Sequence, residues 1–505
     1  MSRCRSIALA TFALLGGSAL AGGNAAPALK VTPNPPVPPP AYTPVRWSED
    51  YLYLSKAPKA DPFDGIKYMP LGSDPDWYVS FGAQARLRYE YFNNFNFAPP
   101  TVAQDEDGYY LTRLFAHADL HLGKSARVFV QGKSSMIDDR VGGPRPVDAD
   151  EADIQQLFFD YKFDLGGKNA ATVRLGRQDL IYGSQRMISP LDWTNTRRTF
   201  EGAKIATTFD GGSAGQHALD LFWVRPVNVE KEELNDGDGE TSFAGAYDTI
   251  TLPGVMPGAG TKLELYALAL NRTNARFAAN AAATAAARDE DRYTLGFRLS
   301  GAPKPFDYDV EGAYQFGKFG DQTICAWSIA AEIGYTIAGN SMAPRFYLGF
   351  DAASGDDSGG NFGTFNQLFP LGHAYFGYID VIGRQNIIDL HPGVELTLIQ
   401  NAQFAKKLSF RADYHMFWRQ NEDDAVYNVG AGAGSSPASA GVLRGASGSS
   451  EMYVGSEIDL LLTWQVDRHL QIIGGYSHFF AGDFIENTGA SKDIDFAYMA
   501  VQFTF

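Results

Sequence analysis

Residues 78–91, YVSFGAQARLRYEY, alternate between two kinds of side chain. The odd positions from Val79 to Tyr91 are apolar, whereas the even positions from Ser80 to Glu90 are small or polar and include Arg86 and Arg88. A period of two places the two sets on opposite faces of a β-strand. One face suits hydrocarbon and the other suits water, so this stretch predicts a strand of a membrane-spanning barrel.

The same alternation recurs as far as Phe505, for example at 111–122, 291–299 and 408–419. Each segment has roughly 8–12 residues, the length of a tilted transmembrane strand. The connections alternate long and short, except GKFGDQ at 317–322, which is short where a long one is due. We therefore predict an all-β fold, a transmembrane antiparallel β-barrel of about 18 strands with short periplasmic turns and long extracellular loops.

The N-terminus indicates export. Arg3 and Arg5 precede the apolar stretch IALATFALLGGSALA, which ends in small residues suited to a signal peptidase. We predict a signal peptide at 1–26, a proline-rich tether at 27–45, an N-terminal periplasmic segment at 46–76 and the barrel at 77–505. The expected location is the outer membrane of a Gram-negative cell.

Composition and motifs argue against several classes of function. The 58 Asp and Glu outnumber the 42 Lys and Arg, which disfavours nucleic acid as a partner. No serine is marked as a nucleophile, so we predict no enzyme and no catalytic residue. His117, Asp119 and His121 share one strand face about 6.6–6.8 Å apart. They are interpreted as a polar ladder rather than a metal site, and no cofactor is expected.

Acidic runs fall in the predicted loops, at 148–153 (DADEAD) and 231–240 (KEELNDGDGE). They are either solvated loop faces or sites where divalent cations bridge to lipopolysaccharide.

Arginines recur on the water-facing register of the predicted strands. Charge facing lipid costs about 2–4 kcal/mol near the membrane midplane, so these side chains are expected to point into the lumen. There they either pair with carboxylates as structural ladders or, where they are in surplus, attract anions. Both interpretations stay open.

Residues 171–205, ATVRLGRQDLIYGSQRMISPLDWTNTRRTFEGAKI, closely resemble a region of the alginate-export family of outer-membrane proteins. Shorter matching pieces lie at 46–54, 66–72, 78–90 and 111–123. The resemblance implies an eighteen-stranded monomeric barrel with an electropositive constriction that passes a polyuronate. By position within the motif, these residues resemble the family's basic cluster: Arg174, Arg177, Gln178, Arg186, Arg197 and Arg198.

Two features depart from the alginate exporter itself. QVDRH at 465–469 leaves no room for a periplasmic lid, and the region corresponding to its plugging loop, 134–152, is short and acidic. We predict an outer-membrane channel for an anionic polysaccharide, such as an alginate-like polyuronate, or its fragments, working in export. The alternatives are a general or small-solute uptake porin of the same fold and a structural or adhesive barrel.

The predicted pore-lining, substrate-binding residues are Arg86, Arg88, Arg113, Arg127, Arg174, Arg177, Gln178, Arg186, Arg197, Arg198, Arg292, Arg298, Arg345 and Arg411. The expected partners are the polysaccharide, outer-membrane lipid and lipopolysaccharide, and the assembly machinery that reads a C-terminal strand ending in Phe505. The barrel is expected to be a monomer.

Overall fold

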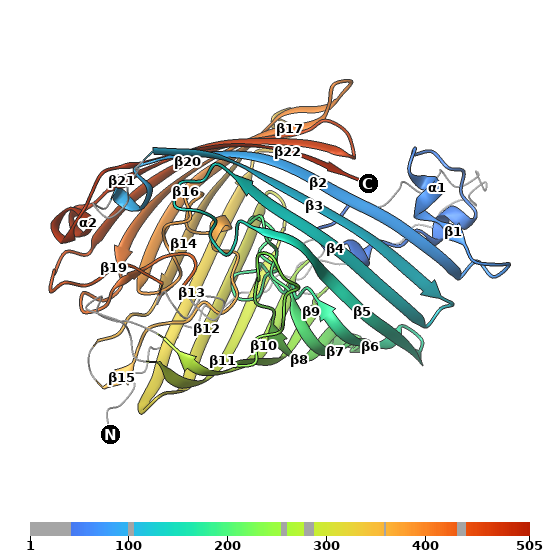
Figure 1. Ribbon diagram of the computed structural model, residues 1–505, viewed down its shortest axis with the longest axis horizontal. Coiled ribbons are helices and arrows are strands. Elements are labelled where there is room, and N and C mark those ends of the chain that lie inside the picture. The colour runs from blue at the N-terminus through green and yellow to red at the C-terminus, as the bar shows by residue number, and fades with distance from the viewer. Residues whose placement is uncertain (1–41, 99–105, 254–259, 277–286, 358–359, 432–440) are drawn as a thin grey trace, which may run out of the picture.

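The computed structural model describes residues 42–98, 106–253, 260–276, 287–357, 360–431 and 441–505. The predicted signal peptide and most of the predicted tether, residues 1–41, lie outside the described residues. Eighteen antiparallel strands form a single curved wall (Figure 1). These strands are β2 (Trp77–Asn93), β3 (Glu106–Leu122), β4 (Ala126–Asp138), β5 (Asp150–Gly166), β6 (Asn169–Gln178), β7 (Phe200–Asp210), β8 (Gln216–Pro226), β9 (Thr241–Thr251), β10 (Lys262–Ala275), β11 (Arg288–Gly301), β12 (Phe306–Phe319), β13 (Gln322–Thr336), β14 (Arg345–Ala353), β16 (Ile387–Ala402), β17 (Ala405–Arg419), β20 (Tyr453–Gln465), β21 (Leu470–Ala481) and β22 (Ile494–Thr504).

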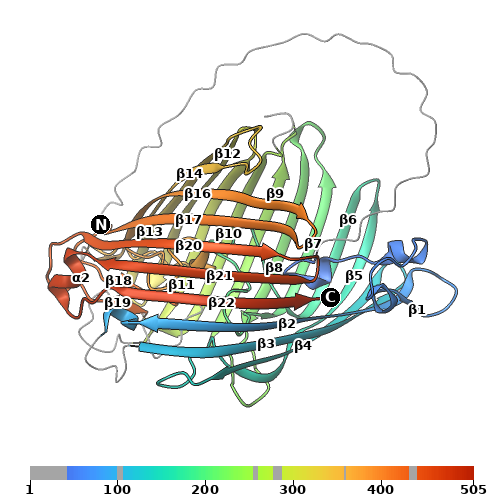
Figure 2. The ribbon, with the colours of Figure 1, turned by 90° about the horizontal axis from the view of Figure 1, so that it is seen from above.

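The wall closes on itself. Each strand pairs with its neighbours in the sequence of the wall, and β22 pairs with β2 in a register that sets Phe503 opposite Ala85 and Asp495 opposite Asn93. Figure 2 shows the first and last strands side by side. A closed cylinder satisfies every strand edge, which a bilayer requires because it offers no water to an unpaired backbone. The predicted barrel and its strand number are confirmed.

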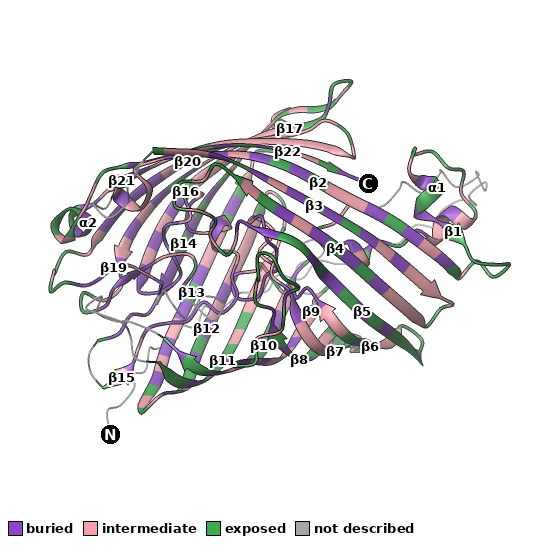
Figure 3. Cartoon of the chain, in the orientation of Figure 1, coloured by how far each residue is buried: buried purple, intermediate pink, exposed green. Residues whose placement is uncertain are grey.

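The two faces of the wall differ as the alternation predicts. On β2, Leu87 is 50% exposed, whereas its neighbours Arg86 and Arg88 are 8% and 2% exposed. Figure 3 shows the same alternation of buried and more exposed positions along the neighbouring strands. Apolar side chains that are exposed on the outer surface face hydrocarbon, and the polar ones face the lumen.

The connections are short at one end of the barrel and long at the other. Residues 123–125 and 403–404 are short turns at one end, whereas 179–199 and 354–386 are long loops at the other. The exception predicted from GKFGDQ is a tight turn at Gly320 and Asp321, between β12 and β13. Gly320 has a φ of 55°, a conformation that glycine adopts without strain.

The remaining elements are short. Figure 1 shows α1 and β1 at one end of the barrel and α2 and β19 at the other. No helix among the described residues has both the length and the apolar character needed to cross a membrane. These elements are η1 (Arg46–Ser48), η2 (Leu52–Ser55), α1 (Asp64–Lys67), β1 (Met69–Pro70), η3 (Phe95–Phe97), η4 (Gly212–Ala214), β15 (Asn361–Phe362), η5 (Gly372–Ala374), β18 (Val426–Tyr427), β19 (Val442–Arg444) and α2 (Asp483–Thr488).

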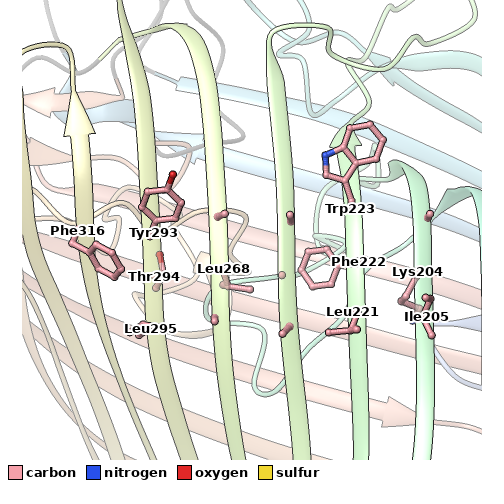
Figure 4. A pocket seen from close by; sticks show the side chains of 16 residues that line it. Lys204, Ile205, Leu221, Phe222, Trp223, Leu268, Tyr293, Thr294, Leu295 and Phe316 are labelled. Carbon is pink, nitrogen blue, oxygen red and sulfur yellow. The ribbon is translucent and has the colours of Figure 1, made fainter.

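One part of the wall carries a shallow apolar groove of 630 Å³. Small side chains such as Ala246 and Ala267 form its floor, and Trp223 and Leu295 lie on either side of it (Figure 4). Trp223 is 65% exposed and Leu295 is 52% exposed, so the groove lies on the lipid-facing side of the wall.

Candidate functional site

The loop between β6 and β7, residues 179–199, folds into the barrel. Arg86 of β2 donates from Nη2 to the carbonyl of Thr194 at 2.7 Å, and Arg113 of β3 donates from Nη1 to that of Asp192 at 2.8 Å. Arg88 donates to the carbonyl of Trp193 at 2.6 Å. Because these arginines point inward from the wall, the loop they hold must lie in the lumen. Charged donors on backbone carbonyls make strong, directional contacts.

Asn195 attaches the same loop to the neighbouring wall. Its Nδ2 donates to the carbonyls of Thr112 at 3.0 Å, Met136 at 3.0 Å and Asp148 at 2.8 Å. One buried amide therefore links the loop to β3, to β4 and to the connection that precedes β5.

A second loop, residues 354–386 between β14 and β16, meets the first inside the barrel. The Ser189 amide donates to the carbonyl of Phe369 at 2.8 Å, and the Phe369 amide donates to that of Met187 at 2.9 Å. The rings of Trp193 and His373 stack with centroids 3.6 Å apart. We call residues 179–199 and 354–386 together the plug.

An apolar core stabilises the plug. Ile188, Leu368 and Phe369 are almost fully buried, and they belong to the same cluster as wall residues such as Phe243. The Phe369 ring lies 4.9 Å from that of Phe243. Burying a large apolar side chain contributes roughly 1.5–3 kcal/mol, so the plug is a packed part of the fold.

Polar contacts also fix the second loop to the wall on both sides of β14 and β16. Gln315 of β12 and Asn366 exchange two hydrogen bonds, at 2.7 and 2.9 Å. On the β20 side, the Ile379 amide donates to Glu457 Oε1 at 2.9 Å. The plug therefore touches the wall at separate places around the lumen.

Most of the arginines predicted on the wall strands form ion pairs inside the lumen. Arg174 binds both oxygens of Asp160, at 2.7 and 2.8 Å, and Arg292 lies 2.6 Å from Glu290. The other pairs are Arg88 with Glu90, Arg113 with Asp192, Arg127 with Asp119, Arg298 with Asp309 and Glu264, Arg345 with Asp307 and Glu332, and Arg411 with Asp413. Arg177 pairs with Asp153 and Glu201, but it lies directly opposite Leu157, which is 44% exposed. This predicted pore-lining residue is therefore on the outward register of β6 and does not line the lumen.

Arg186 and Arg197 of the predicted basic cluster lie in the plug and are also paired. Arg186 lies 2.8 Å from Asp309 of β12, and Arg197 lies 2.8 Å from Asp179. Gln178 ends β6 and is fully buried.

Arg198 differs from the other plug arginines because no carboxylate among the described residues forms an ion pair with it. It donates to the carbonyl of Ser189 at 3.0 Å, and burial lowers its pKa to about 10. Asp192, a carboxylate of the same loop, behaves differently. Burial alone would raise the pKa of that carboxyl, but Arg113 and Arg197 hold it below its ordinary value.

Three cavities inside the wall each hold more basic than acidic side chains. The largest has a volume of 600 Å³ and lies at the long-loop end, beside the plug. Its basic residues are Arg197, Arg198, Arg272 and Arg276, and its acidic ones are Glu230, Asp238 and Glu240.

The other two cavities lie toward the short-turn end. One of 330 Å³ lies between the plug and residues 42–44, and it is lined by Arg86 and Arg88 against Asp192. The other, of 400 Å³, is lined by Arg345, Lys407 and Arg411 against Glu395. Among the side chains that line these cavities, basic ones outnumber acidic ones, although the net charge of the chain is −16. Several of the lining arginines are paired with carboxylates outside the lining, as Arg411 is with Asp413 and Arg345 with Asp307.

The N-terminal segment enters the lumen from the short-turn end. The Trp47 ring lies 3.8 Å from the Arg174 guanidinium, which lies between this ring and that of Phe158. Arg46 donates to the carbonyl of Phe505 at 2.8 Å. The segment thus occupies part of the periplasmic opening and contacts the end of the chain.

Sequence reasoning did not identify Trp193, His373 or the second loop of the plug. A signal was present, because residues 362–382 are too rich in Phe, Leu and Ile for a solvated loop. The region compared with the exporter's plugging loop, 134–152, instead lies beside the plug: the carbonyl of Val147 accepts from the Asn195 amide at 3.1 Å.

Comparisons with known proteins agree with this architecture. A family model described as alginate export matches residues 77–497, which confirms the resemblance found in the sequence. No curated protein sequence matches the chain. The matched family is one of outer-membrane channel proteins rather than of enzymes.

Solved structures share the fold at low identity. OpdO of Pseudomonas aeruginosa is 12% identical, over 84% of this chain and 97% of that chain, with a TM-score of 0.51. OccK8 (OprE) of the same organism is 11% identical, over 85% and 98%, with a TM-score of 0.52. OccAB2 of Acinetobacter baumannii is 10% identical, over 84% and 98%, with a TM-score of 0.53.

Proposed function

Because this chain belongs to the alginate export family, we propose that it is an outer-membrane channel through which an anionic polysaccharide, or fragments of one, leaves the cell. The observation that carries this proposal is the surplus of basic side chains in all three lumen cavities. Overall acidity does not oppose it, since loop charges farther than about 8 Å from the path are screened at physiological salt. The loop carboxylates that line the largest cavity, Glu230, Asp238 and Glu240, are already included in its count of acidic side chains.

The chemistry of the path suits carboxylate groups spaced along a chain. A guanidinium fork matches a carboxylate in geometry, and Arg keeps its charge at every physiological pH. Existing partners such as Asp413 beside Arg411 weaken each contact with a passing uronate. Several weak contacts in series favour sliding over tight binding, as conduction requires.

The second candidate is uptake of a small anionic solute by the same channel. The plug favours it, because the cavities of 330–600 Å³ are small for a polymer. Among the fold neighbours, OpdK of Pseudomonas aeruginosa was solved with vanillate, at 10% identity and a TM-score of 0.50. Export of a polymer requires the plug to move aside, whereas passage of a small solute does not.

We propose the outer membrane as the location, with lipid and lipopolysaccharide around the wall. We also propose that assembly machinery reads the C-terminal strand. Phe505 exchanges two backbone hydrogen bonds with Ala83, at 2.9 and 3.0 Å, so the end of this strand is joined to the first strand of the barrel.

The proposal is tested by measuring how added sugars block the ionic current through single channels in a planar bilayer. Oligouronates of increasing length are added on the periplasmic side, and neutral oligosaccharides of the same lengths serve as the control. The proposal expects block by the uronates only, with residence time rising with length. Block that is already maximal with a monomer supports the small-solute alternative, and equal block by neutral sugars contradicts an arginine path.

Charge-reversed variants test whether the lumen arginines are the groups that hold the uronates. Arg198→Glu and Arg411→Glu are expected to shorten the oligouronate residence time several-fold. Arg225→Glu, on a half-exposed side chain that lines none of the three cavities, is the matched control.

A further inference from the structure

Two histidines and an aspartate converge on the inner face of the wall. Oδ2 of Asp389 lies 2.8 Å from Nδ1 of His391 and 2.8 Å from Nδ1 of His415. All three side chains are buried, with exposed fractions of 0%, 5% and 3%. Three donor atoms of the kind that bind metals, one from each residue, lie within 4.8 Å of one another.

Two neighbouring strands supply this cluster, which explains its compactness. Asp389 and His391 lie on the same face of β16, and His415 reaches across from β17. Same-face positions on one strand are about 6.6–6.8 Å apart, so two successive side chains can reach each other, as Asp389 and His391 do, but the third ligand comes from the neighbouring strand. The set at His117, Asp119 and His121 shows the difference: Arg127 pairs with Asp119 there, and the His117 ring stacks on Phe129.

We propose that Asp389, His391 and His415 form a binding site for a divalent transition-metal ion of the Zn²⁺ type. Imidazole nitrogens with one carboxylate are a ligand set that Zn²⁺ takes in proteins, with a fourth position left for water. Bonds of about 2.0–2.2 Å in tetrahedral geometry set the ligand atoms roughly 3.3–3.6 Å apart. The separations here, from 2.8 Å to at most 4.8 Å, bracket that range.

A buried carboxylate oxygen without a hydrogen-bond partner supports the presence of a bound cation. Oδ1 of Asp389 has no hydrogen-bond partner among the described residues, although its side chain is fully buried. Leaving a buried charged oxygen unpaired is costly, and a cation coordinated by the carboxylate removes that cost.

The contacts that surround the three proposed ligands also fit a bound metal ion. Nε2 of His415, the nitrogen that faces away from Asp389, lies 3.8 Å from Oδ2 of Asp459 on β20. A histidine that binds a metal usually directs its second nitrogen at a carboxylate, which orients the ring. Oδ1 of Asp459 also accepts from the Tyr378 amide of the plug at 3.3 Å. A bound ion would therefore stiffen the base of the plug, and the proposal stands whatever the channel transports.

The test is Zn²⁺ binding by the full chain purified in detergent and stripped with chelator, measured by titration calorimetry. We expect one Zn²⁺ per barrel in the wild type and loss of that binding in His391→Ala/His415→Ala. His217→Ala and His478→Ala are matched controls, because each histidine contacts an aspartate at 2.8 Å without a second histidine beside it. These controls are expected to retain the bound ion.

A milder variant keeps the test decisive if the double variant does not fold. Asp459→Asn leaves all three ligands in place and is expected to weaken binding by about 10–100-fold, the usual effect of losing such an outer partner. Co²⁺ as a probe should give visible absorption bands in the wild type that change in this variant. The proposal is overturned if the wild type binds no more Zn²⁺ than the double variant, or if the controls lose binding equally.

Discussion

Arginines of the wall and arginines that hold the plug are the same residue type in two different roles. Arg174 and Arg127 bind carboxylates 14 and 8 residues away in the sequence, on the adjacent strand. Arg86 and Arg113 instead bind backbone carbonyls 106 and 79 residues away, in a loop. The wall pairs set the stability of the cylinder, whereas the plug contacts set how much of the lumen is open.

Shortening the plug is expected to have the largest effect, which is an increase in single-channel conductance. Replacing residues 362–382 with a short Gly–Ser linker removes buried apolar side chains and their contacts but no wall strand. Single-channel conductance should rise several-fold while the barrel still migrates as a folded species in unheated gels. Unchanged conductance would mean that the plug does not limit the path.

Breaking a wall pair should instead reduce stability. Arg174→Gln leaves Asp160 buried without its bidentate partner, and losing one side of a buried pair costs about 3–5 kcal/mol. The denaturant concentration at which half of the barrels are unfolded measures this loss of stability. Arg225→Gln is the control, since its contact with Glu201 is half-exposed and contributes about 0–1 kcal/mol. Equal shifts for the two variants would remove the distinction between buried and exposed pairs.

Asn195→Ala tests the attachment of the first plug loop. It removes a buried amide whose two N–H donors reach three carbonyls, and a loss of about 1 kcal/mol per donor gives roughly 2 kcal/mol in all. Amide hydrogen exchange in residues 190–199 should become faster by the factor that this loss of free energy represents, while exchange in β16 stays unchanged. Asn271→Ala, at an exposed bond to Asp291, is the matched control. Uniform loosening of the whole barrel would contradict a local attachment.

The smallest expected effect is a pH dependence at the contact between the second plug loop and the loop before β20. Asp424 accepts from the Thr364 hydroxyl at 2.7 Å and from the Asp356 amide at 2.9 Å, and burial raises its pKa from 3.8 to about 6. The folded state therefore holds this proton more firmly than the unfolded chain does. That contribution is full below about pH 4 and is lost as the pH rises through about 6.

The predicted loss is about 1–2 kcal/mol, below the roughly 3 kcal/mol that the whole shift represents, because water reaches the loop ends. Exchange at the Thr364 amide, corrected for its intrinsic rate, should speed up between pH 4 and 7. In Asp424→Asn the trend should disappear. Protection that increases with pH would reverse the assigned sign.

The wall could be predicted from the sequence because its determinants are local. The period of two in residues 78–91 gives the orientation of Arg86 and Leu87 without any knowledge of neighbours. Even the tight turn at Gly320 could be predicted, because the sequence has a short connection where the alternation calls for a long loop. The individual ion pairs depend on register: Arg174 meets Asp160 because β5 and β6 set these two residues opposite each other.

The plug could not be predicted in the same way. Its contacts join residues such as Trp193 and His373, which have no periodic relation and meet only after the cylinder has closed. A long loop between two strands is compatible with both an outer and an inner position. The sequence likewise left the arginines between an anion path and ion-pair ladders, because one strand does not reveal which carboxylates the others bring.

The reversal potential of the wild-type channel under a salt gradient tests the account most directly. Because basic side chains outnumber acidic ones in the lining of the lumen cavities, chloride is predicted to cross more readily than potassium. A channel that prefers potassium would contradict the arginine path, because the paired carboxylates would then govern the lumen.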